Sequence, residues 1–202
     1  MISPVNVHPY LYKGNYDFKF DTIKDRVDEY VNYARENPMD ETPEMDGGVT
    51  TVVQCFNDPP HNWDIFQDFN EYVFKCVDDL WNLWKYHPMP RDLMQSWINV
   101  HPKGAWTKEH HHQHVAVAVA AYLHVPENSG RLLIKDPLGV YKYNEPLIYG
   151  YHDKGFDWEA VDVESGDILF FPGWLTHKTE VNSSEHDRYV MSMNIRALHH
   201  QA

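Results

Sequence analysis

The sequence EHHHQHVAVAVAAYLHV spans residues 109–125, and the fold assignment starts from it. Its second half alternates valine with alanine, which is typical of a β-strand whose two faces meet different surroundings. If the strand extends back through the histidines, His110, His112 and His114 share a face with the alanines and Tyr122. The valines then lie opposite and suit a packed core, whereas a row of alanines leaves room for a pocket. Small side chains facing bulky aromatic ones would give the same pattern, so the pocket is the favoured of two interpretations.

The sequence GDILFFPGWLTH, residues 166–177, supplies a further histidine from another predicted strand. Imidazoles two positions apart in an extended segment can converge on one ion, so His110, His112 and His177 form a candidate metal site. Three protein ligands leave coordination positions open, as catalytic sites do. The pair His112 and His114 has the same spacing and remains an alternative register. Six other histidines have no such context and are treated as ordinary: His8, His61, His87, His101, His199 and His200.

Arg188 begins the predicted strand 188–195, eleven positions after the last of these histidines. The even-numbered residues of that strand, up to Asn194, are expected to face the same interior as Arg188. A buried guanidinium is costly without an anion, and a carboxylate that accepts two hydrogen bonds is its natural partner. The alternative is a surface ion pair with Asp187 or Glu185.

The rest of the pattern predicts a mainly β fold with flanking helices. Helices are expected over residues 21–37, with Asp21 as N-cap, and 62–86, whose aromatic stripe favours core packing over a ligand surface. Strands are expected at 5–12 (closed by a turn at Gly14-Asn15), 50–56, 95–100, 115–125, 130–135, 167–171, 178–181 and 188–195, with an exposed loop at 39–48. Short strands following two helices indicate a β-sandwich or jelly roll with the helices packed on one face. We expect one domain over 1–202, in which 1–95 support a jelly-roll core at 96–198.

Composition excludes several function classes. The formal net charge of −13 argues against a nucleic-acid backbone or an anionic membrane as the main partner. Two cysteines imply no disulfide framework, and neither a signal peptide nor an apolar stretch of membrane-spanning length is evident. The sequence therefore predicts a soluble, cytoplasmic protein.

On these residues the chain resembles the Fe(II)/2-oxoglutarate-dependent oxygenases, and more narrowly an uncharacterised branch of them. The resemblance covers about residues 96–198. It is carried by the following segments: Ser96-Trp97-Ile98-Asn99, His110-His111-His112, Ala120-Ala121-Tyr122-Leu123, Ser129-Gly130 leading to Asp136-Pro137, 166–177, and Arg188 to Asn194.

What the resemblance implies is a double-stranded β-helix, or jelly roll, that binds Fe(II) and uses 2-oxoglutarate as cosubstrate. His110 and His177 would be metal ligands, and Arg188 would bind the far carboxylate of 2-oxoglutarate. Tyr122 would be a second hydrogen-bond donor to that carboxylate, and Asn194 would line the same pocket. The implied reaction is hydroxylation of a small-molecule or peptide substrate, with decarboxylation of 2-oxoglutarate to succinate. Trp106, Trp174 and the tyrosine-rich loop 140–151 are expected at the substrate entrance, and a homodimer is compatible with this reading.

The chain departs from the family pattern at one ligand. Most members have His-x-Asp, and here the position of the aspartate is occupied by His112, so the third ligand is this histidine or an acid from elsewhere. The pairing of His110 with His112 is preferred because it keeps the family's ten-residue distance to Tyr122. Two alternatives remain: a cupin-like dioxygenase that uses three histidines without 2-oxoglutarate, and a non-catalytic jelly-roll binding or structural protein that contains a metal.

Overall fold

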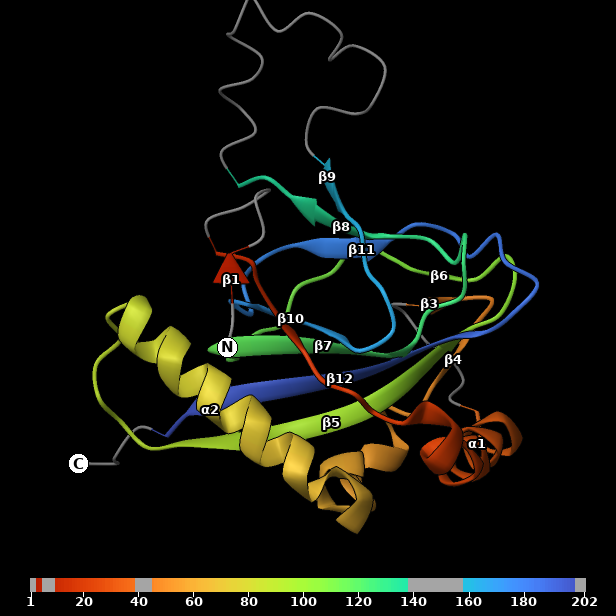
Figure 1. Ribbon diagram of the computed structural model, residues 1–202, viewed down its shortest axis with the longest axis horizontal. Coiled ribbons are helices and arrows are strands. Elements are labelled where there is room, and N and C mark those ends of the chain that lie inside the picture. The colour runs from red at the N-terminus through yellow and green to blue at the C-terminus, as the bar shows by residue number, and fades with distance from the viewer. Residues whose placement is uncertain (1–2, 5–9, 39–44, 138–157, 199–202) are drawn as a thin grey trace, which may run out of the picture.

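The computed structural model describes residues 3–4, 10–38, 45–137 and 158–198. Its largest sheet runs through the middle of the molecule, and all of its described strand pairs are antiparallel (Figure 1). In spatial order its seven strands are β1 (Ser3–Pro4), β2 (Tyr12–Asn15), β10 (Asp167–Phe171), β7 (Val117–His124), β12 (Arg188–Ala197), β5 (Arg91–His101) and β4 (Val49–Thr50).

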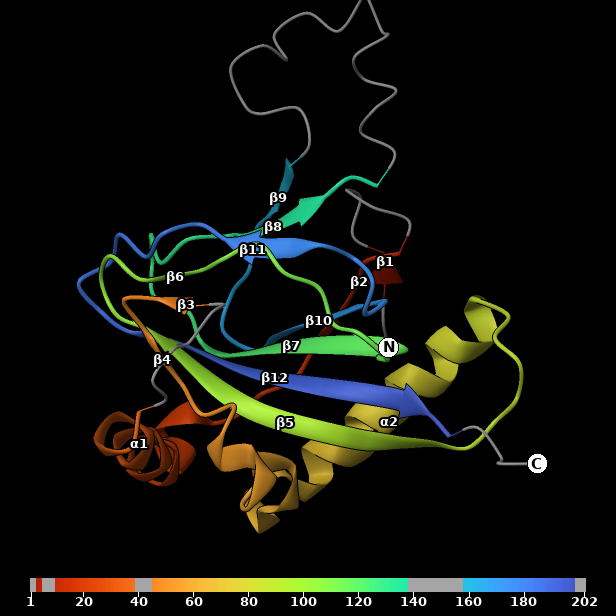
Figure 2. The same cartoon turned by 180° about the vertical axis from the view of Figure 1, so that it is seen from behind.

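Two small sheets lie over one face of this large sheet (Figure 2). One has the order β11 (His177–Thr179), β8 (Leu132–Lys135) and β9 (Trp158–Val161), and the other pairs β3 (Met45–Asp46) with β6 (Trp106–Thr107). From β5 to β12 the chain therefore passes back and forth between the layers, with β8 and β9 together in one small sheet, as in a jelly roll. The predicted mainly β, double-stranded β-helix architecture with flanking helices is confirmed.

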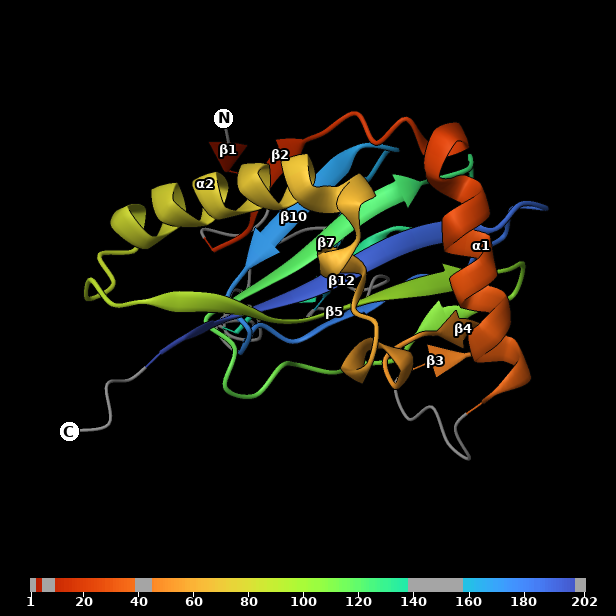
Figure 3. The same cartoon turned by 90° about the horizontal axis from the view of Figure 1, so that it is seen from below.

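Both helices cover the opposite face of the large sheet, as predicted (Figure 3). Helix α1 (Phe20–Glu36) buries the expected stripe, which includes Val27 and Val31. The expected N-cap is wrong, because Lys19 occupies that position in a left-handed conformation and Asp21 lies in the first turn. An acidic side chain there still stabilises the partial positive charge of the helix N-terminus.

Helix α2 (Gln67–Leu83) is shorter than the predicted 62–86. Two turns of 3-10 helix precede it, η2 (Pro60–Asn62) and η3 (Asp64–Phe66), and Ile65, which was assigned to the buried stripe, is 46% exposed. Phe66, Phe69 and Trp81 are buried against the sheet, so the aromatic stripe is core and not a ligand surface. No helix in the described part of the chain combines the length and the apolar character needed to cross a membrane.

Two local predictions are wrong. Gly14 and Asn15 form no turn but belong to β2, because they pair with Ile168 and Asp167 of β10, so tertiary pairing overrides the local residue preference. The predicted strand 50–56 ends at Thr50, and the 3-10 helix η1 (Gln54–Phe56) follows, held by local backbone hydrogen bonds such as that from Cys55 to Thr51. Residues 5–9 and 39–44 of the predicted strand and loop lie outside the described part of the chain.

Side-chain alternation along the central strands separates two cores. The odd-numbered residues of β7 and β12, such as Val119 and Met191, pack against the helices. The even-numbered residues, such as Ala118, Tyr122 and Val190, face the small sheets. The predicted division into valine and alanine faces is confirmed, and the alanine side opens toward the space between the sheets.

Candidate metal centre

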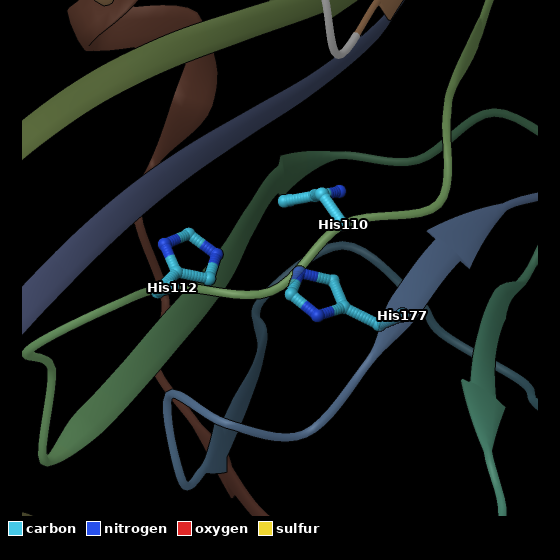
Figure 4. Close-up of side chains that lie close together, drawn as sticks. All are labelled: His110, His112 and His177. Atoms are coloured by element: carbon cyan, nitrogen blue, oxygen red, sulfur yellow. The ribbon is translucent and has the colours of Figure 1, made fainter.

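Three imidazoles converge between the sheets. His110 and His112 project from one loop and His177 from the first residue of β11, and the rings point toward one another (Figure 4). One ring nitrogen from each residue lies within 4.8 Å of the other two. The ring centroids are 4.2 Å apart for His110 and His177, and 5.2 Å apart for each pair that includes His112. Among the described residues, no carboxylate belongs to this cluster.

Backbone hydrogen bonds hold the two segments in place. His110 and His177 exchange both of their backbone hydrogen bonds, each 3.0 Å long, in an isolated antiparallel bridge. The N–H of His112 donates to the carbonyl of Gly173 at 2.8 Å. A Cβ atom on Gly173 would lie 2.4 Å from the Val115 carbonyl oxygen and 2.9 Å from that of His112. The close approach of the two loops therefore requires glycine at this corner.

The predicted extension of β7 back through the histidines is wrong. The strand begins at Val117, and His114 lies in a turn with a φ of 60°. Its side chain is exposed, so the alternative pair of His112 and His114 is not brought together. The loop, and not the pleat of a strand, places His110 and His112 on one side.

Hydrogen bonds fix the tautomer of two of the three rings. Nδ1 of His110 lies 2.8 Å from the Lys108 carbonyl oxygen, and Nδ1 of His177 lies 2.9 Å from that of Leu175. Because a carbonyl oxygen only accepts hydrogen bonds, each Nδ1 carries the proton and each Nε2 presents a lone pair. This is the arrangement of a metal-ligating histidine with its supporting hydrogen bond.

The electrostatic surroundings keep the rings of His112 and His177 neutral. Burial lowers the pKa of His112 to about 3, and the neighbouring histidines His110 and His111 lower it further while a hydrogen bond with Asn194 opposes the shift. Burial also holds the pKa of His177 well below its ordinary value, again reinforced by its histidine neighbours. Neutral imidazole is the form that binds metal ions.

A cavity of about 250 Å³ opens beside the three rings. Ala118, Ala120 and Tyr122 of β7 contribute to its wall, so the favoured interpretation of the alanine row is confirmed. From β12 come Val190 and Ser192, the even-numbered positions that follow Arg188. Other lining residues are Met45, Trp97, Asn99, His101, Thr107 and Thr179. Apart from the histidines, the described residues of this wall include no ionisable side chain other than the Tyr122 phenol.

Arg188 is fully buried at the start of β12. Its Nη1 donates to the carbonyls of Ser129 and Gly130, at 2.6 and 2.8 Å. Its Nε and Nη2 have no hydrogen-bond partner. The alternative of a surface ion pair between Arg188 and Asp187 or Glu185 is wrong. Glu185 pairs with Lys103, and the Asp187 carboxylate lies 3.9 Å from the Arg35 guanidinium. Within the described chain, Arg188 is thus a buried cation with two unused N–H donors.

Tyr122 and Asn194 occupy different positions relative to the cavity. Tyr122 lines it and interacts electrostatically with Arg188, and burial raises the pKa of its hydroxyl to about 12. Asn194 is buried but does not line the cavity; its side chain influences the pKa of His112, and its Oδ1 has no hydrogen-bond partner. Trp106, which is half-buried, and Trp174, which is 48% exposed, do not line it either. The expected entrance loop 140–151 lies outside the described residues.

Sequence reasoning missed one residue of this site. His101, which was treated as ordinary, lines the cavity and is 1% exposed. It pairs with Arg188 across β5 and β12. The signal that identifies it is the alternation along β5, which places Trp97, Asn99 and His101 on one face.

A family model with the description "Putative 2OG-Fe(II) oxygenase" matches residues 95–194. No curated protein matches the sequence. The matched segment begins within β5 and contains the three clustered histidines, Tyr122, Arg188 and Asn194.

Several solved structures share the fold. A prolyl-4-hydroxylase from Pseudomonas putida is 11% identical, with a TM-score of 0.61 over 95% of both chains. A viral collagen prolyl hydroxylase from Paramecium bursaria Chlorella virus-1, in complex with 2-oxoglutarate, is 13% identical, with a TM-score of 0.57 over 94% of this chain and 97% of that one. HygX from Streptomyces hygroscopicus, with nickel and 2-oxoglutarate bound, is 14% identical, with a TM-score of 0.56 over 93% and 82%.

Proposed function

We infer that this chain, which belongs to the family of 2OG-Fe(II) oxygenases through residues 95–194, hydroxylates its substrate. In such a reaction 2-oxoglutarate and O₂ are consumed, succinate and CO₂ are released, and one oxygen atom enters a C–H bond of the substrate. The observation that carries the proposal is the convergence of three imidazoles on one point beside a cavity.

In this proposal His110, His112 and His177 hold the ferrous ion. Nitrogen donors suit iron, and the fixed Nδ1–H tautomers of His110 and His177 support binding through Nε2. When bound, the ion supplies the redox chemistry that couples O₂ to the cosubstrate. Because only three protein ligands are available, coordination positions remain for small molecules. Asn194 is assigned to orienting His112 and not to direct contact with the cosubstrate.

We further propose that Arg188 and Tyr122 bind the distal carboxylate of 2-oxoglutarate. The unused Nε and Nη2 of Arg188 suit a carboxylate that accepts two hydrogen bonds, and such an anion would offset the cost of burying the guanidinium. Tyr122 stays protonated at physiological pH because its pKa is raised to about 12, so its hydroxyl can donate to the same anion. The residues present thus fit both groups that the family uses.

The cavity also constrains the substrate. A volume of about 250 Å³ is at the small end for a ligand pocket, and part of it would be taken by 2-oxoglutarate. We therefore propose that only a small part of the substrate enters, such as one side chain of a peptide or one end of a small molecule. Since the wall has no acidic or basic side chain besides its histidines, this part is expected to be uncharged.

The all-histidine cluster favours one competing function, a cupin-like dioxygenase that needs no 2-oxoglutarate. Arg188 distinguishes the two, because without a dicarboxylate its buried charge would have no directly paired anion among the described residues; Glu180 acts on it but pairs with Arg131. A purely structural metal is a weaker alternative, since structural sites are normally closed by four protein ligands.

The test is turnover of 2-oxoglutarate by protein reconstituted with Fe(II). We expect succinate formation that requires Fe(II). It should be abolished in Arg188→Met, which removes the charge but keeps much of the side-chain volume. It should be strongly reduced in Arg188→Lys, because lysine lacks the planar guanidinium that donates two hydrogen bonds to one carboxylate. Arg196→Met is the matched control, because Arg196 lies on the same strand but pairs with Asp92 at the surface. Substrate oxidation at the full rate without 2-oxoglutarate would reject the proposal in favour of the cupin-like alternative.

A further inference from the structure

We propose that His101 is a third cosubstrate-binding residue, whose Nδ1–H donates to the distal carboxylate of 2-oxoglutarate beside Arg188. The inference rests on the function proposed above and extends it to a residue that lies outside the metal cluster, on β5. It starts from the fact that His101 is the remaining histidine in the cavity wall.

The first support is an unpaired atom in a buried position. His101 is 1% exposed, and its Nδ1 has no hydrogen-bond partner. Buried side-chain nitrogens are rarely left unpaired in folded proteins, so such an atom at a cavity wall indicates a missing ligand. His101 pairs with Arg188 across neighbouring strands, and Arg188 has two unpaired nitrogens of its own. Three unused polar atoms thus belong to two paired residues, of which His101 lines the cavity and Arg188 lies beside it on the next strand.

The second support is the way the ring is held. Nε2 of His101 lies 2.7 Å from the Thr107 hydroxyl oxygen. The backbone N–H of Thr107 donates in turn to the hydroxyl oxygen of Thr179, at 2.9 Å. His101 is therefore fixed through a short chain of hydrogen bonds from β5 to β6 and β11, and this chain leaves only Nδ1 free.

The third support is the protonation state. Burial, together with the positive charge of Arg188, holds the pKa of His101 well below its ordinary value, so the ring is neutral and carries a single N–H. If the Thr107 hydroxyl donates to Nε2, that N–H is on Nδ1. An anion held by Arg188 favours this tautomer, because the opposite one would direct a lone pair at a carboxylate. A neutral donor beside one guanidinium binds a single carboxylate without a second buried charge.

The experiment compares two ligands and several variants. 2-Oxopentanoate has the carbon chain of 2-oxoglutarate but a methyl group in place of the distal carboxylate. Binding of both to protein loaded anaerobically with Fe(II) is measured by calorimetry, and the preference is the ratio of the two dissociation constants. In His101→Phe we expect the preference for 2-oxoglutarate to fall about tenfold or more, as for a lost hydrogen bond to a charged group, with 2-oxopentanoate little affected.

His101→Asn keeps an N–H donor near the position of Nδ1, so it should restore most of the preference that His101→Phe loses. Thr107→Val should lower the preference part of the way, because it frees the ring to adopt the other tautomer. The matched control is His61→Phe, since His61 bonds the Ser96 hydroxyl outside the cavity and its loss should leave the preference unchanged.

The outcomes separate the two proposals. If the unaltered protein binds 2-oxoglutarate with a preference that folded His101→Phe retains, the role of His101 is rejected and the proposed function stands. If His101→Phe does not fold, an unchanged preference in Thr107→Val together with a lost preference in His101→Asn would reject it equally. If the unaltered protein binds neither ligand, both proposals fail.

Discussion

At the scale of single residues, the replacement of the family's aspartate by His112 changes the charge of the proposed site. Three neutral imidazoles would leave the double positive charge of Fe(II) unreduced, whereas a carboxylate ligand would remove one unit. 2-Oxoglutarate would bring one negative charge to the ion, because its distal carboxylate is assigned to Arg188, so the centre would keep one net positive charge with its imidazoles neutral. The same neutrality makes the metal-free protein sensitive to acid.

We predict that the free energy of unfolding of the metal-free protein falls as the pH drops below about 6.5. His101, His112 and His177 have folded-state pKa values below the unfolded value, so the unfolded chain takes up protons first and is favoured by acid. Each ring contributes up to about 1.4 kcal/mol per pH unit in this window, and the contribution is absent above it. Urea unfolding between pH 7.5 and 5 measures the slope.

His101 gives a direct check on this slope, because it does not belong to the cluster of three histidines. His101→Asn should reduce the pH dependence by one proton. A free energy that stays constant from pH 7.5 to 5 would show that the buried rings are not held neutral.

At the scale of elements, the two faces of β7 were predictable from the sequence, whereas its first residue was not. Its alternation of valine and alanine predicted both faces correctly, because the side-chain period of a strand is a local property. The turn at His114 and the start of the strand at Val117 were not predictable. They depend on the contact of the 110–112 loop with Gly173, about sixty residues away, which no local pattern records.

Two adjacent alanines test the faces of β7. Ala120→Leu is expected to fill the cavity and to weaken 2-oxoglutarate binding at least tenfold with little change in thermal stability. Ala121 is fully buried against the helices, so Ala121→Leu should instead cost about 1–3 kcal/mol of unfolding free energy and leave binding intact. Calorimetric binding and thermal unfolding of both variants are the measurements, and the reverse pattern would contradict the assignment of the faces.

Gly173 tests the junction that positions His112. In Gly173→Ala the new methyl group would collide with two backbone carbonyls, which cannot move away as a flexible side chain would. The 110–112 loop must shift, and we expect metal affinity to fall about tenfold or more, as when other supports of a ligand are lost. Anaerobic titration with Co(II) as a spectroscopic substitute measures this affinity.

Gly104→Ala is the control for Gly173→Ala. Gly104 has a φ of 86° with no neighbouring atom within 4 Å, so the substitution introduces backbone strain without a collision. It should cost about 1–2 kcal/mol of stability and leave metal affinity unchanged. Equal loss of metal affinity in both variants would mean that the junction at Gly173 has no special role.

At the scale of the whole molecule, the helix-side core and the cavity-side core are formed by opposite faces of the same strands, β7, β10 and β12. The cavity therefore depends on a helical layer that has no direct contact with it. This dependence supports the single-domain organisation expected over 1–202, which remains a prediction. The overall class was predictable because helix and strand periods are strong signals, whereas the exchange of strands between layers depends on long-range pairing.

Phe69→Ala tests this dependence. Phe69 is 1% exposed and packs edge-on against Tyr16 and Phe18, so its loss should lower the unfolding free energy by about 3–5 kcal/mol. We expect urea curves from tryptophan fluorescence and from metal release to shift together and to coincide. A metal centre that survives after the helical layer has unfolded would show two independent units.

The central claim is that His110, His112 and His177 hold one Fe(II) to which 2-oxoglutarate binds. Its most direct test is an anaerobic titration with Fe(II) and then 2-oxoglutarate, followed by visible absorption. We predict one ion per chain and a charge-transfer band that appears only with both components, is lost in His112→Ala and is retained in His111→Ala. No band in the unaltered protein, or a band of equal strength in His112→Ala, would contradict the account.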